Sequence, residues 1–371
     1  MDINVGWRRA IHAGLLGVAA FGSAANAAYL HVCNTCAHTT VQSAVNAAVS
    51  GDSIFVAAGR YVENVTIAGK DLAIFGADDG TAATTLIIGT GRGPVFTLGD
   101  AVVGGVTFTI ALHNLTITGG QHTNASGEGG GIQVRRGAKL GLFASVVAHN
   151  VATYGAGISF NNSDAVDNFI SNSTIEYNSA IGPGTAVVAA GGGVAVLSGG
   201  VDIAGLTVVN NDAVKGGGIY SAAGARLSLD RSTVSHNSVH AIQVEDKSYV
   251  GGQGGGLFVA SAYSISNDVI TSNRSDALTG GGGGLFLDAG TSVDVGGGIH
   301  DTLVALNSNG VGIGGGISIS GGAGKTATLT KDYIVQNVGT GISNTSTLVV
   351  TDSIIRDNSG PNCVGGTGCP N

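Results

Sequence analysis

Hydrophobic and polar positions repeat along this chain in register with one asparagine per unit. Three residues before each of these asparagines stands a β-branched residue, and eight residues before each stands an aliphatic one. The position directly before the asparagine is free, ranging from His to Leu. The asparagines are Asn150, Asn178, Asn211, Asn237, Asn273, Asn307, Asn337 and Asn358. The units vary from 21 to 36 residues and the variation falls after the asparagine, which is typical of a solenoid with loops on one side.

The alternation within each unit has the period of a strand. In Arg226–Asp230, Leu227 and Leu229 are expected to face one way and Ser228 the other. Each unit contains three such segments, separated by an Asn turn and a Gly turn, with no helical spacing. We therefore predict an all-β fold, a single-stranded right-handed parallel β-helix with three strands per coil. A leucine-rich repeat would need a denser leucine pattern and shorter, more uniform units.

Glycine-rich triplets that end in an aliphatic residue mark the second turn of the unit. They recur at Gly129–Ile132, Gly155–Ile158, Gly191–Val194, Gly216–Ile219, Gly254–Leu257, Gly282–Leu285 and Gly314–Ile317. Glycine permits a positive φ and a close approach between stacked coils. The asparagine is expected to tolerate the left-handed conformation and to hydrogen-bond along a ladder. No Lys-Ser/Thr pair or opening helix follows the triplets, so we predict no nucleotide site and no cofactor.

The N-terminus has the features of a signal peptide, predicted over residues 1–27. Arg8 and Arg9 precede a short apolar run, and Ala25-Asn26-Ala27 forms a small-x-small cleavage site. The alternative is a buried first helix. The apolar run is too short for a membrane helix, so no transmembrane segment is expected in the mature chain.

Three further regions follow the signal peptide. Residues 28–51 are predicted to be a cap, because Val41, Ala44, Val45 and Ala48 share one helical face that could cover the end of a solenoid core. Thr39 or Thr40 is the expected N-cap and Gly51 the expected stop. The β-helix is predicted over 52–360, and a cysteine-containing tail over 361–371.

Charge and composition limit the classes of molecule that the protein is expected to bind. The chain has a formal net charge of −8. Loss of the signal peptide leaves 14 basic and 23 acidic residues and a net charge of −9. Such acidity disfavours nucleic acid and anionic membranes. The only tryptophan, Trp7, leaves with the signal peptide, so none remains to stack on a sugar ring. A monomer is expected.

The cysteines of the mature chain lie at its two ends. Roughly a dozen coils at about 4.8 Å each separate the two pairs, so only local pairs are plausible within one molecule, Cys33–Cys36 and Cys363–Cys369. Export would supply the oxidising compartment. The alternative at the N-terminal end is a metal site, because four ligand types fall within eight residues of the chain. These residues are His31, Cys33, Cys36 and His38.

Two stretches carry family resemblances. The segment GDSIFVAAGRYVENVTI, Gly51 to Ile67, resembles the first coil of pectin-lyase-like β-helix proteins, including pectin methylesterases. The later repeats are similar to those of chlamydial polymorphic outer-membrane proteins. Here GGG-I and Val/Ile-x-x-Asn stand where that family has Gly-Gly-Ala-aliphatic and Phe-x-x-Asn. The resemblance to that family would imply an autotransporter barrel. The chain shows no alternating barrel strands before Asn371, so insertion into a membrane by such a barrel is not expected.

The resemblances assign a fold and no catalytic residue. The paired aspartates and the Leu-Gly-Arg-Pro-Trp segment of the esterases do not occur, nor do the Asn-Thr-Asp, Asp-Asp and Gly-His-Gly motifs of polygalacturonases. Any catalytic group must therefore be argued from this sequence alone.

Candidate chemistry gathers in the insertion after Asn237. β-Helix enzymes place carboxylates on one outer face as acids, bases or cation ligands. A groove between this insertion and the 179–190 insertion is geometrically feasible, although a charged loop tip is usually only solvated. The candidates for catalysis are His236, His240, Glu245, Asp246 and Glu176. Arg135 and Arg136 are candidates for contact with an anionic sugar.

The missing motifs and scattered acids favour an exported, non-catalytic β-helix of a bacterial type. It would present a long surface for adhesion, glycan contact or envelope structure, with a polysaccharide or cell-surface glycan as partner. The expected location is extracellular or on the outer cell surface, with the periplasm as the alternative. The alternative function is a polysaccharide-acting enzyme, either a lyase or a glycoside hydrolase.

Overall fold

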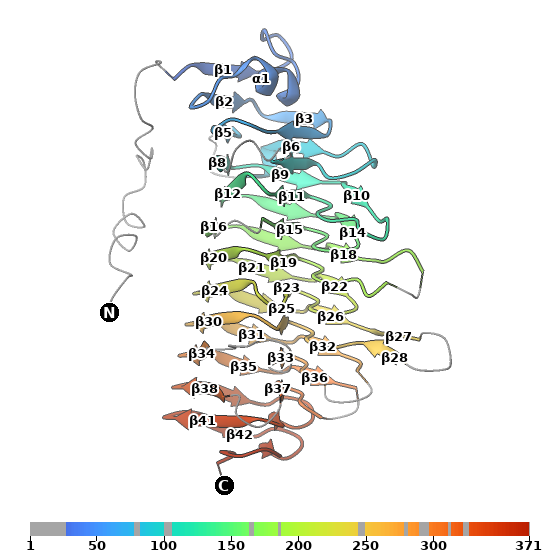
Figure 1. The fold of residues 1–371 in the computed structure, drawn as a ribbon, viewed down its shortest axis with the longest axis vertical. Helices are drawn as coiled ribbons and strands as arrows, with labels where there is room; N and C mark the ends of the chain where they lie inside the picture. Colours follow the sequence, from blue (N-terminus) through green and yellow to red (C-terminus); the bar gives the residue numbers. More distant parts are fainter. Residues whose placement is uncertain are drawn as a thin grey trace.

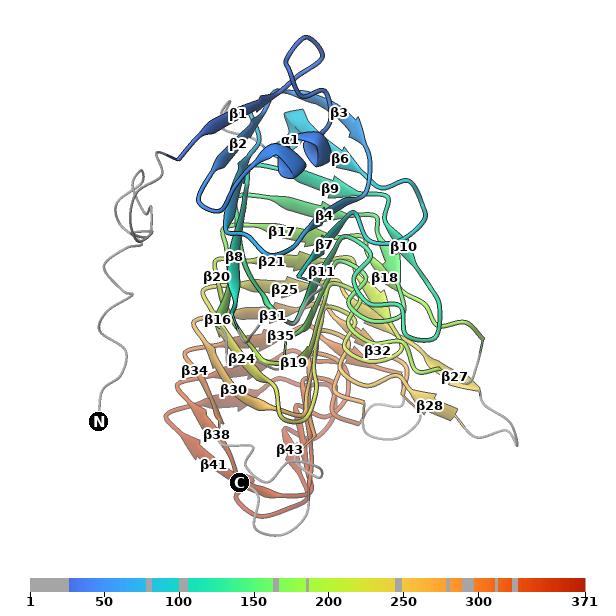
Figure 2. The ribbon, with the colours of Figure 1, turned by 45° about the horizontal axis from the view of Figure 1, so that its top comes forward.

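The computed structural model shows a long solenoid with a helical cap at one end (Figure 1). It describes residues 27–77, 82–99, 106–162, 167–184, 187–243, 249–277, 281–288, 297–310, 313–321 and 326–370. Coils stack one on another from the cap to the C-terminal end, and a view tilted toward the axis shows the sheets as separate faces of the stack (Figure 2). The fold is the predicted right-handed parallel β-helix.

Two of the three long faces are parallel sheets that we call sheet A and sheet B. Sheet A contains β1 (Tyr29–Val32), β2 (Ser53–Val56), β5 (Leu72–Phe75), β8 (Phe108–His113), β12 (Ala138–Phe143), β16 (Asp167–Ser171), β20 (Gly200–Ala204), β24 (Arg226–Asp230), β30 (Ala262–Ser266), β34 (Gly297–His300), β38 (Thr326–Thr330) and β41 (Thr347–Thr351). Sheet B contains β3 (Gly59–Val62), β6 (Thr85–Ile88), β9 (Thr116–Thr118), β13 (Val146–Ala148), β17 (Thr174–Glu176), β21 (Thr207–Val209), β25 (Thr233–Ser235), β31 (Val269–Thr271), β35 (Leu303–Ala305), β39 (Tyr333–Val335) and β42 (Ile354–Arg356). A short 3-10 helix, Ala82–Thr84, precedes β6.

The third long face is sheet C, and a narrow sheet D lies between B and C. Sheet C contains β4 (Val65–Ile67), β7 (Phe96–Leu98), β11 (Ile132–Arg135), β15 (Ile158–Asn161), β19 (Val194–Ser198), β23 (Ile219–Ser221), β29 (Leu257–Val259), β33 (Leu285–Asp288), β37 (Ile317–Ser320), β40 (Ile342–Asn344) and β43 (Cys363–Val364). Sheet D contains β10 (Gln121–His122), β14 (Val151–Ala152), β18 (Ser179–Ala180), β22 (Asp212–Ala213), β26 (Ser238–Val239), β32 (Arg274–Ser275) and β36 (Ser308–Asn309). β27 (Ala241–Gln243) and β28 (Tyr249–Gly251) form an antiparallel hairpin that projects from this side (Figure 1). The sequence predicted three strands per coil, and the two-residue strands of sheet D are an addition.

The core follows the predicted register. Leu229 pairs with Ile203 and Ile265 in sheet A, and all three are at most 2% exposed. In sheet B, Val234 is likewise fully buried, whereas His236 two residues later is exposed. In the last of these coils, Val350 and Ile355 are only partly buried against the same core. Apolar side chains at these two columns therefore form one continuous core along the axis.

The sequence analysis expected the asparagine of the Asn turn to adopt the left-handed conformation, and this prediction is wrong. The residue directly before the asparagine is left-handed instead. All eight residues in this free column have φ between 52° and 58°, including His236 and Leu306. The exposed side chains in this column do not pack in the core, so their identity varies. The backbone of the same residues must still adopt the left-handed conformation.

The Gly turn uses its glycines for two different reasons. Gly216, the first of its triplet, has φ of 58°. Gly217 has no such requirement, but a Cβ there would lie 2.4 Å from the carbonyl oxygen of Ser238 and 2.5 Å from that of Gly255. The first glycine is needed for its conformation and the second for the close approach of the next coil.

The cap is the helix α1, Val41–Ala47, which contacts β1, β2 and β4. Its buried face is the predicted one, and Thr40 is the N-cap, with its hydroxyl accepting a hydrogen bond from the Ser43 N–H at 3.1 Å. Glu63 adds a second cap, since its carboxylate accepts the N–H groups of Val41 and Gln42 at 2.8 Å each. The helix ends before Gly51, because Ala48 already has an extended conformation.

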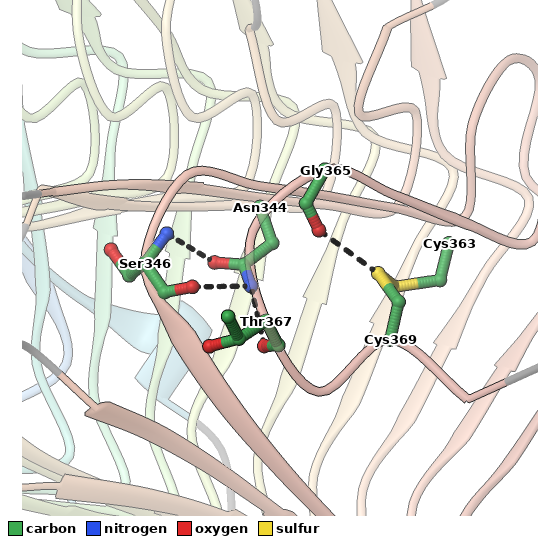
Figure 3. Close-up of a disulfide and its surroundings, with 6 residues drawn as sticks. All are labelled: Asn344, Ser346, Cys363, Gly365, Thr367 and Cys369. Carbon is green, nitrogen blue, oxygen red and sulfur yellow. Dashed lines mark hydrogen bonds between the residues drawn. A yellow bond between two sulfur atoms is a disulfide. The ribbon is translucent and has the colours of Figure 1, made fainter. Parts of the chain in front are cut away.

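Both local disulfides are present. Cys33 bonds to Cys36, and Cys363 bonds to Cys369 in the loop after the last coil (Figure 3). The first bond removes both thiolates that the metal alternative needed, so a site of His31, Cys33, Cys36 and His38 is contradicted. Nowhere in the described ranges do three or more His, Cys, Asp or Glu residues gather as a metal site would require. None of the helices in these ranges is long and apolar enough to cross a membrane.

Candidate functional site

A cavity of about 510 Å³ lies on the outer face of sheet C near the capped end. Its floor is formed by three outward side chains on adjacent strands, Thr66 on β4, Thr97 on β7 and Gln133 on β11, which are direct neighbours in the register. Its walls come from residues 92–94 and from β10 with the two residues after it, and Arg135 lies at the end of β11. The cavity is open to solvent and joins residues that lie far apart in the sequence.

Hydrogen bonds hold both walls in place. Asn64 accepts the Thr90 N–H at 3.1 Å and donates to the Gly93 carbonyl at 3.4 Å. The Gln121 N–H donates to the same Gly93 carbonyl at 3.1 Å, which joins one wall to the other. The carbonyl of Asn124 accepts the Thr153 hydroxyl at 2.7 Å. Sites built on such supported loops keep their side chains in a fixed arrangement.

The charged side chains among the described lining residues are two arginines. Arg92 is exposed, and Arg135 is half-buried. None of the described residues lining the cavity carries a carboxylate; the other polar groups are amides, hydroxyls and the His122 imidazole. On a chain of net charge −8, a pair of arginines in a carboxylate-free cavity favours an anionic ligand.

His122 is held in one orientation. Its Nδ1 lies 2.9 Å from the backbone carbonyl oxygen of Glu128. A carbonyl can only accept, so Nδ1 carries the proton, and in the neutral ring the lone pair lies on Nε2. The imidazole is thus arranged to accept a proton through its other nitrogen.

Gln133 supplies a buried acceptor on the cavity floor. The residue is only 3% exposed, and its Oε1 has no hydrogen-bond partner. The next outward residue along sheet C, Ser159, is fully buried and its hydroxyl also has no partner. A buried acceptor without a partner is costly, so Gln133 is suited to a donor from a bound molecule, such as a sugar hydroxyl.

The groove that the sequence predicted between the two insertions also exists. It is a smaller cavity of about 270 Å³, lined by Ala180, Ile181, Gly182, Gly184, Val187, Val214, His240 and Ile242. His240 Nδ1 lies 3.3 Å from Asp212 Oδ1, and this hydrogen bond raises the pKa of His240. The lining is apolar apart from His240, which leaves few groups to orient a sugar.

The other predicted residues lie elsewhere. Glu176 is on β17 of sheet B, and His236 is exposed at the corner after β25, so neither lines this smaller cavity. Glu245 and Asp246 lie outside the described residues. Arg135 lines the larger cavity, whereas Arg136 is exposed beside it.

Sequence reasoning missed Arg92, His122 and Gln133. The available signal was the polar stretch between Gly119 and Gly129, an insertion containing one histidine before the first Gly triplet. This stretch contains no cluster of carboxylates, which was the feature that the sequence analysis sought.

No family model and no curated protein matches the chain. Among solved structures it is similar to the pectate lyase Pel9A, at 14% identity and a TM-score of 0.43, over 89% of this chain and 79% of that one. It is similar to the Aspergillus niger pectin methylesterase at 14% identity and a TM-score of 0.40, over 94% of each chain. It is also similar to the GH87 alpha-1,3-glucanase of Streptomyces thermodiastaticus strain HF3-3, at 13% identity and a TM-score of 0.35, over 91% of this chain and 70% of that one. At these identities the likeness concerns the fold alone.

The prediction of a non-catalytic surface protein is contradicted. The solved β-helix proteins named above are a lyase, an esterase and a glucanase, whereas the sequence analysis had placed catalysis second. The grounds against catalysis were the absent family motifs, the absent tryptophan and the scattered carboxylates. None of these grounds bears on a cavity lined by Arg92, His122 and Arg135, whose members come from two adjacent coils.

Proposed function

We propose that the protein is an enzyme that cleaves an acidic, uronate-containing polysaccharide by β-elimination in the sheet C cavity. The observation that carries the proposal is the meeting of Arg92, Arg135 and His122 in one carboxylate-free cavity, a statement limited to its described lining. The sequence left lyase and hydrolase open, and the chemistry of these residues favours the lyase.

The arginines would bind the uronate carboxylate. A guanidinium matches a carboxylate in shape and can make two parallel hydrogen bonds to it. Neutralising this carboxylate makes the proton on the adjacent carbon more acidic, because negative charge develops on the carboxyl oxygens as that proton leaves. Gln133 and the threonines of the floor would orient the sugar hydroxyls.

His122 Nε2 would act as the base. It takes the proton from the carbon next to the carboxylate, and the C–H electron pair forms a carbon–carbon double bond. The glycosidic C–O bond on the neighbouring carbon breaks, and its electron pair leaves with the oxygen, which takes a proton from solvent to become a hydroxyl, while His122 returns its proton to solvent. The products are a new chain end and an unsaturated uronate end. The bond from Nδ1 to the Glu128 carbonyl keeps Nε2 as the acceptor.

Glycoside hydrolysis is a poorer fit to this cavity. It ordinarily requires two carboxyl groups, one as acid and the other as base or nucleophile. The described lining of the sheet C cavity contains none.

The test is a screen of purified protein on polygalacturonate and alginate for unsaturated uronate ends. His122→Ala, Arg92→Ala and Arg135→Ala should each lower the rate by about a hundredfold or more, in line with the usual contribution of one acid–base or electrostatic group. His149→Asn at the corner after β13 and Arg356→Ala on β42, both exposed and outside the cavity lining, are matched controls and should leave the rate unchanged. Release of reducing ends without unsaturated ends would show hydrolysis and contradict the elimination mechanism.

Export of the enzyme is part of the proposal. The two disulfides favour an oxidising compartment, and the predicted signal peptide lies outside the described residues. We propose cleavage near Ala28, a monomeric solenoid and an extracellular or cell-surface location. The similarity of the repeats to chlamydial polymorphic outer-membrane proteins stays a prediction. N-terminal sequencing of exported protein tests processing, and an intact Met1 would contradict it.

A further inference from the structure

We infer that the sheet C cavity is closed at one end, so that it receives the end of a polysaccharide chain and the enzyme releases short products from that end. This inference rests on the proposed function, because it concerns how a substrate would enter the same site. The inference adds the mode of attack to the proposed function, because it predicts cleavage from a chain end instead of at internal linkages.

A strap of two hydrogen-bonded side chains, Glu128 and Asn161, lies on the β15 side of the floor, outside the set of residues that line the cavity. Asn161, the last residue of β15, donates from Nδ2 to Glu128 Oε1 at 2.8 Å. Its Oδ1 accepts the Ser198 hydroxyl at 3.0 Å. Glu128 lies just before the Gly turn that precedes β11. Asn161 lies at the C-terminal end of β15, the neighbour of β11 in sheet C. The hydrogen bond between them therefore crosses the outer face of sheet C diagonally.

The burial of the next outward residue along sheet C indicates where the cavity ends. The floor residues of β4, β7 and β11 line the cavity, whereas Ser159, the next in the same outward column, does not. Ser159 is fully buried although it faces outward on β15. A chain lying along the floor would therefore meet the Glu128–Asn161 pair after Gln133.

The length of the floor fits a chain end. Three adjacent strands span two strand spacings, about 10 Å. A sugar polymer lying along this direction could place only a short terminal segment on Thr66, Thr97 and Gln133. Arg135 and His122 lie in the part of the cavity next to the closed end, so cleavage would release short products.

The experiment compares chain shortening with bond cleavage on polygalacturonate and alginate. Wild-type enzyme should form unsaturated ends while viscosity falls slowly, with only short oligomers as products. Glu128→Ala and Asn161→Ala should open the cavity, so that viscosity falls much faster for each bond cut and longer oligomers are released. Glu128→Ala keeps the backbone carbonyl that holds His122, and Asp202→Asn on sheet A is the matched control. Thermal melts of all variants exclude unfolding as the cause.

A binding measurement makes the test independent of turnover. Oligouronates carrying a bulky aminobenzamide tag on one end are compared with untagged oligomers by calorimetry on His122→Ala protein. A tag on the end that enters should weaken binding about tenfold or more, and Glu128→Ala should restore it. If tags on either end are tolerated, or if wild type releases long oligomers from the start, the chain-end inference fails while the proposed function stands. If neither polymer is bound or cleaved, the proposed function fails and the inference with it.

Discussion

The side-chain amide of Asn237 donates a hydrogen bond to Oδ1 of Asn273 in the next coil, at 3.0 Å. Its own Oδ1 accepts both the backbone N–H and the side-chain amide of Asn211 in the previous coil. Every step from Asn150 to Asn358 repeats this amide-to-amide bond at 3.0 to 3.1 Å. The ladder therefore links coils whose sequence separation varies from 21 to 36 residues, and it fixes their register.

Asn237→Ala should destabilise the protein strongly. The side chain is fully buried and also donates to the carbonyls of Val208 and Ser235, so its removal leaves several buried groups without partners. At about 1–3 kcal/mol for each buried group left unsatisfied, we expect a loss of about 3 kcal/mol or more. Denaturant unfolding measures this loss.

The neighbouring position gives the control for that measurement. His236→Asn changes an exposed residue of φ 55° to one that tolerates this conformation, so its free energy of unfolding should stay within about 0.5 kcal/mol of wild type. Leu229→Asp, which puts a carboxylate into the core, should unfold the coil. A cost below about 1 kcal/mol for Asn237→Ala would contradict the ladder as a source of stability.

Leu306→Asn should stabilise the protein. Leu306 occupies the left-handed column with φ of 58° and is 55% exposed, so it carries a conformational strain with little compensating burial. Asn210 occupies the same column three coils earlier, at φ 56°. We expect a gain of about 0.5–1 kcal/mol, seen as a higher melting temperature. Leu306→Ala, which keeps the strain, should give no such gain; an equal gain would show that exposure and not conformation is the cause.

The fold could be predicted from the sequence because its core columns repeat. Val234 and its counterparts must be β-branched or aliphatic in every coil, and eight repetitions make that signal visible. The left-handed column could not be assigned, because it accepts residues as different as Tyr177 and Asp357 and leaves no compositional trace.

The site was harder to predict than the fold. Thr66, Arg92 and Arg135 meet only because loops of different lengths bring three coils to one cavity. Sequence reasoning looked for clustered carboxylates and so selected the insertion after Asn237. A site made of cations, amides and one histidine has no local spacing that identifies it.

Loss of the C-terminal disulfide should have a small effect. Cys363 and Cys369 close a loop of only a few residues, so the bond restrains the unfolded chain little. The loop is also held by other contacts, since Asn344 donates to the Thr367 carbonyl at 3.4 Å (Figure 3). Cys363→Ser with Cys369→Ser should lose about 2 kcal/mol or less and keep wild-type activity. Complete loss of the folded state on this double replacement would show that the tail nucleates or seals the last coil.

Asp268 should make the protein less stable as pH rises. Burial raises the pKa of Asp268 to about 7, and the residue is 1% exposed. The folded state therefore holds this proton more tightly than the unfolded state, in which an aspartate titrates near 4. The stabilisation is complete below about pH 4 and is lost as pH rises toward 7.

Asp268→Ser should remove this dependence and raise the melting temperature at pH 8. Serine suits the position, because Ser232 in the same column of the previous coil accepts the Leu206 N–H and donates to the Asp230 carbonyl, both at 3.1 Å. Asp357→Asn, an exposed change that suits the left-handed backbone there, is the control and should leave the slope unchanged. An unchanged pH dependence in Asp268→Ser would mean that the carboxyl group is not the source.

His113 should give the opposite pH dependence. Its ring lies in an aromatic stack on the outer face of sheet A, 4.6 Å from the Phe75 ring and 4.5 Å from the Phe143 ring. Burial lowers the pKa of His113 to about 4. The unfolded state therefore takes up the proton first, so this residue's contribution to stability is present above pH 6.5 and is lost as pH falls toward 4.

His113→Phe should abolish that acid-side loss while keeping the stack, because phenylalanine fills the same place between Phe75 and Phe143 and cannot be protonated. Melting temperatures of wild type and variant should coincide more closely at pH 7 than at pH 4.5, where the variant should be the more stable. His31→Phe tests the exposed end of the same stack, 5.8 Å from Phe55, and should change the slope little.

Since Asp268 acts with the opposite sign, His113→Phe should lower the gain in stability on going from pH 4.5 to 7, and Asp268→Ser should increase it. If both variants shifted the slope in the same direction, the two assignments could not both be correct, and titration of the His113 ring by NMR would decide which one fails.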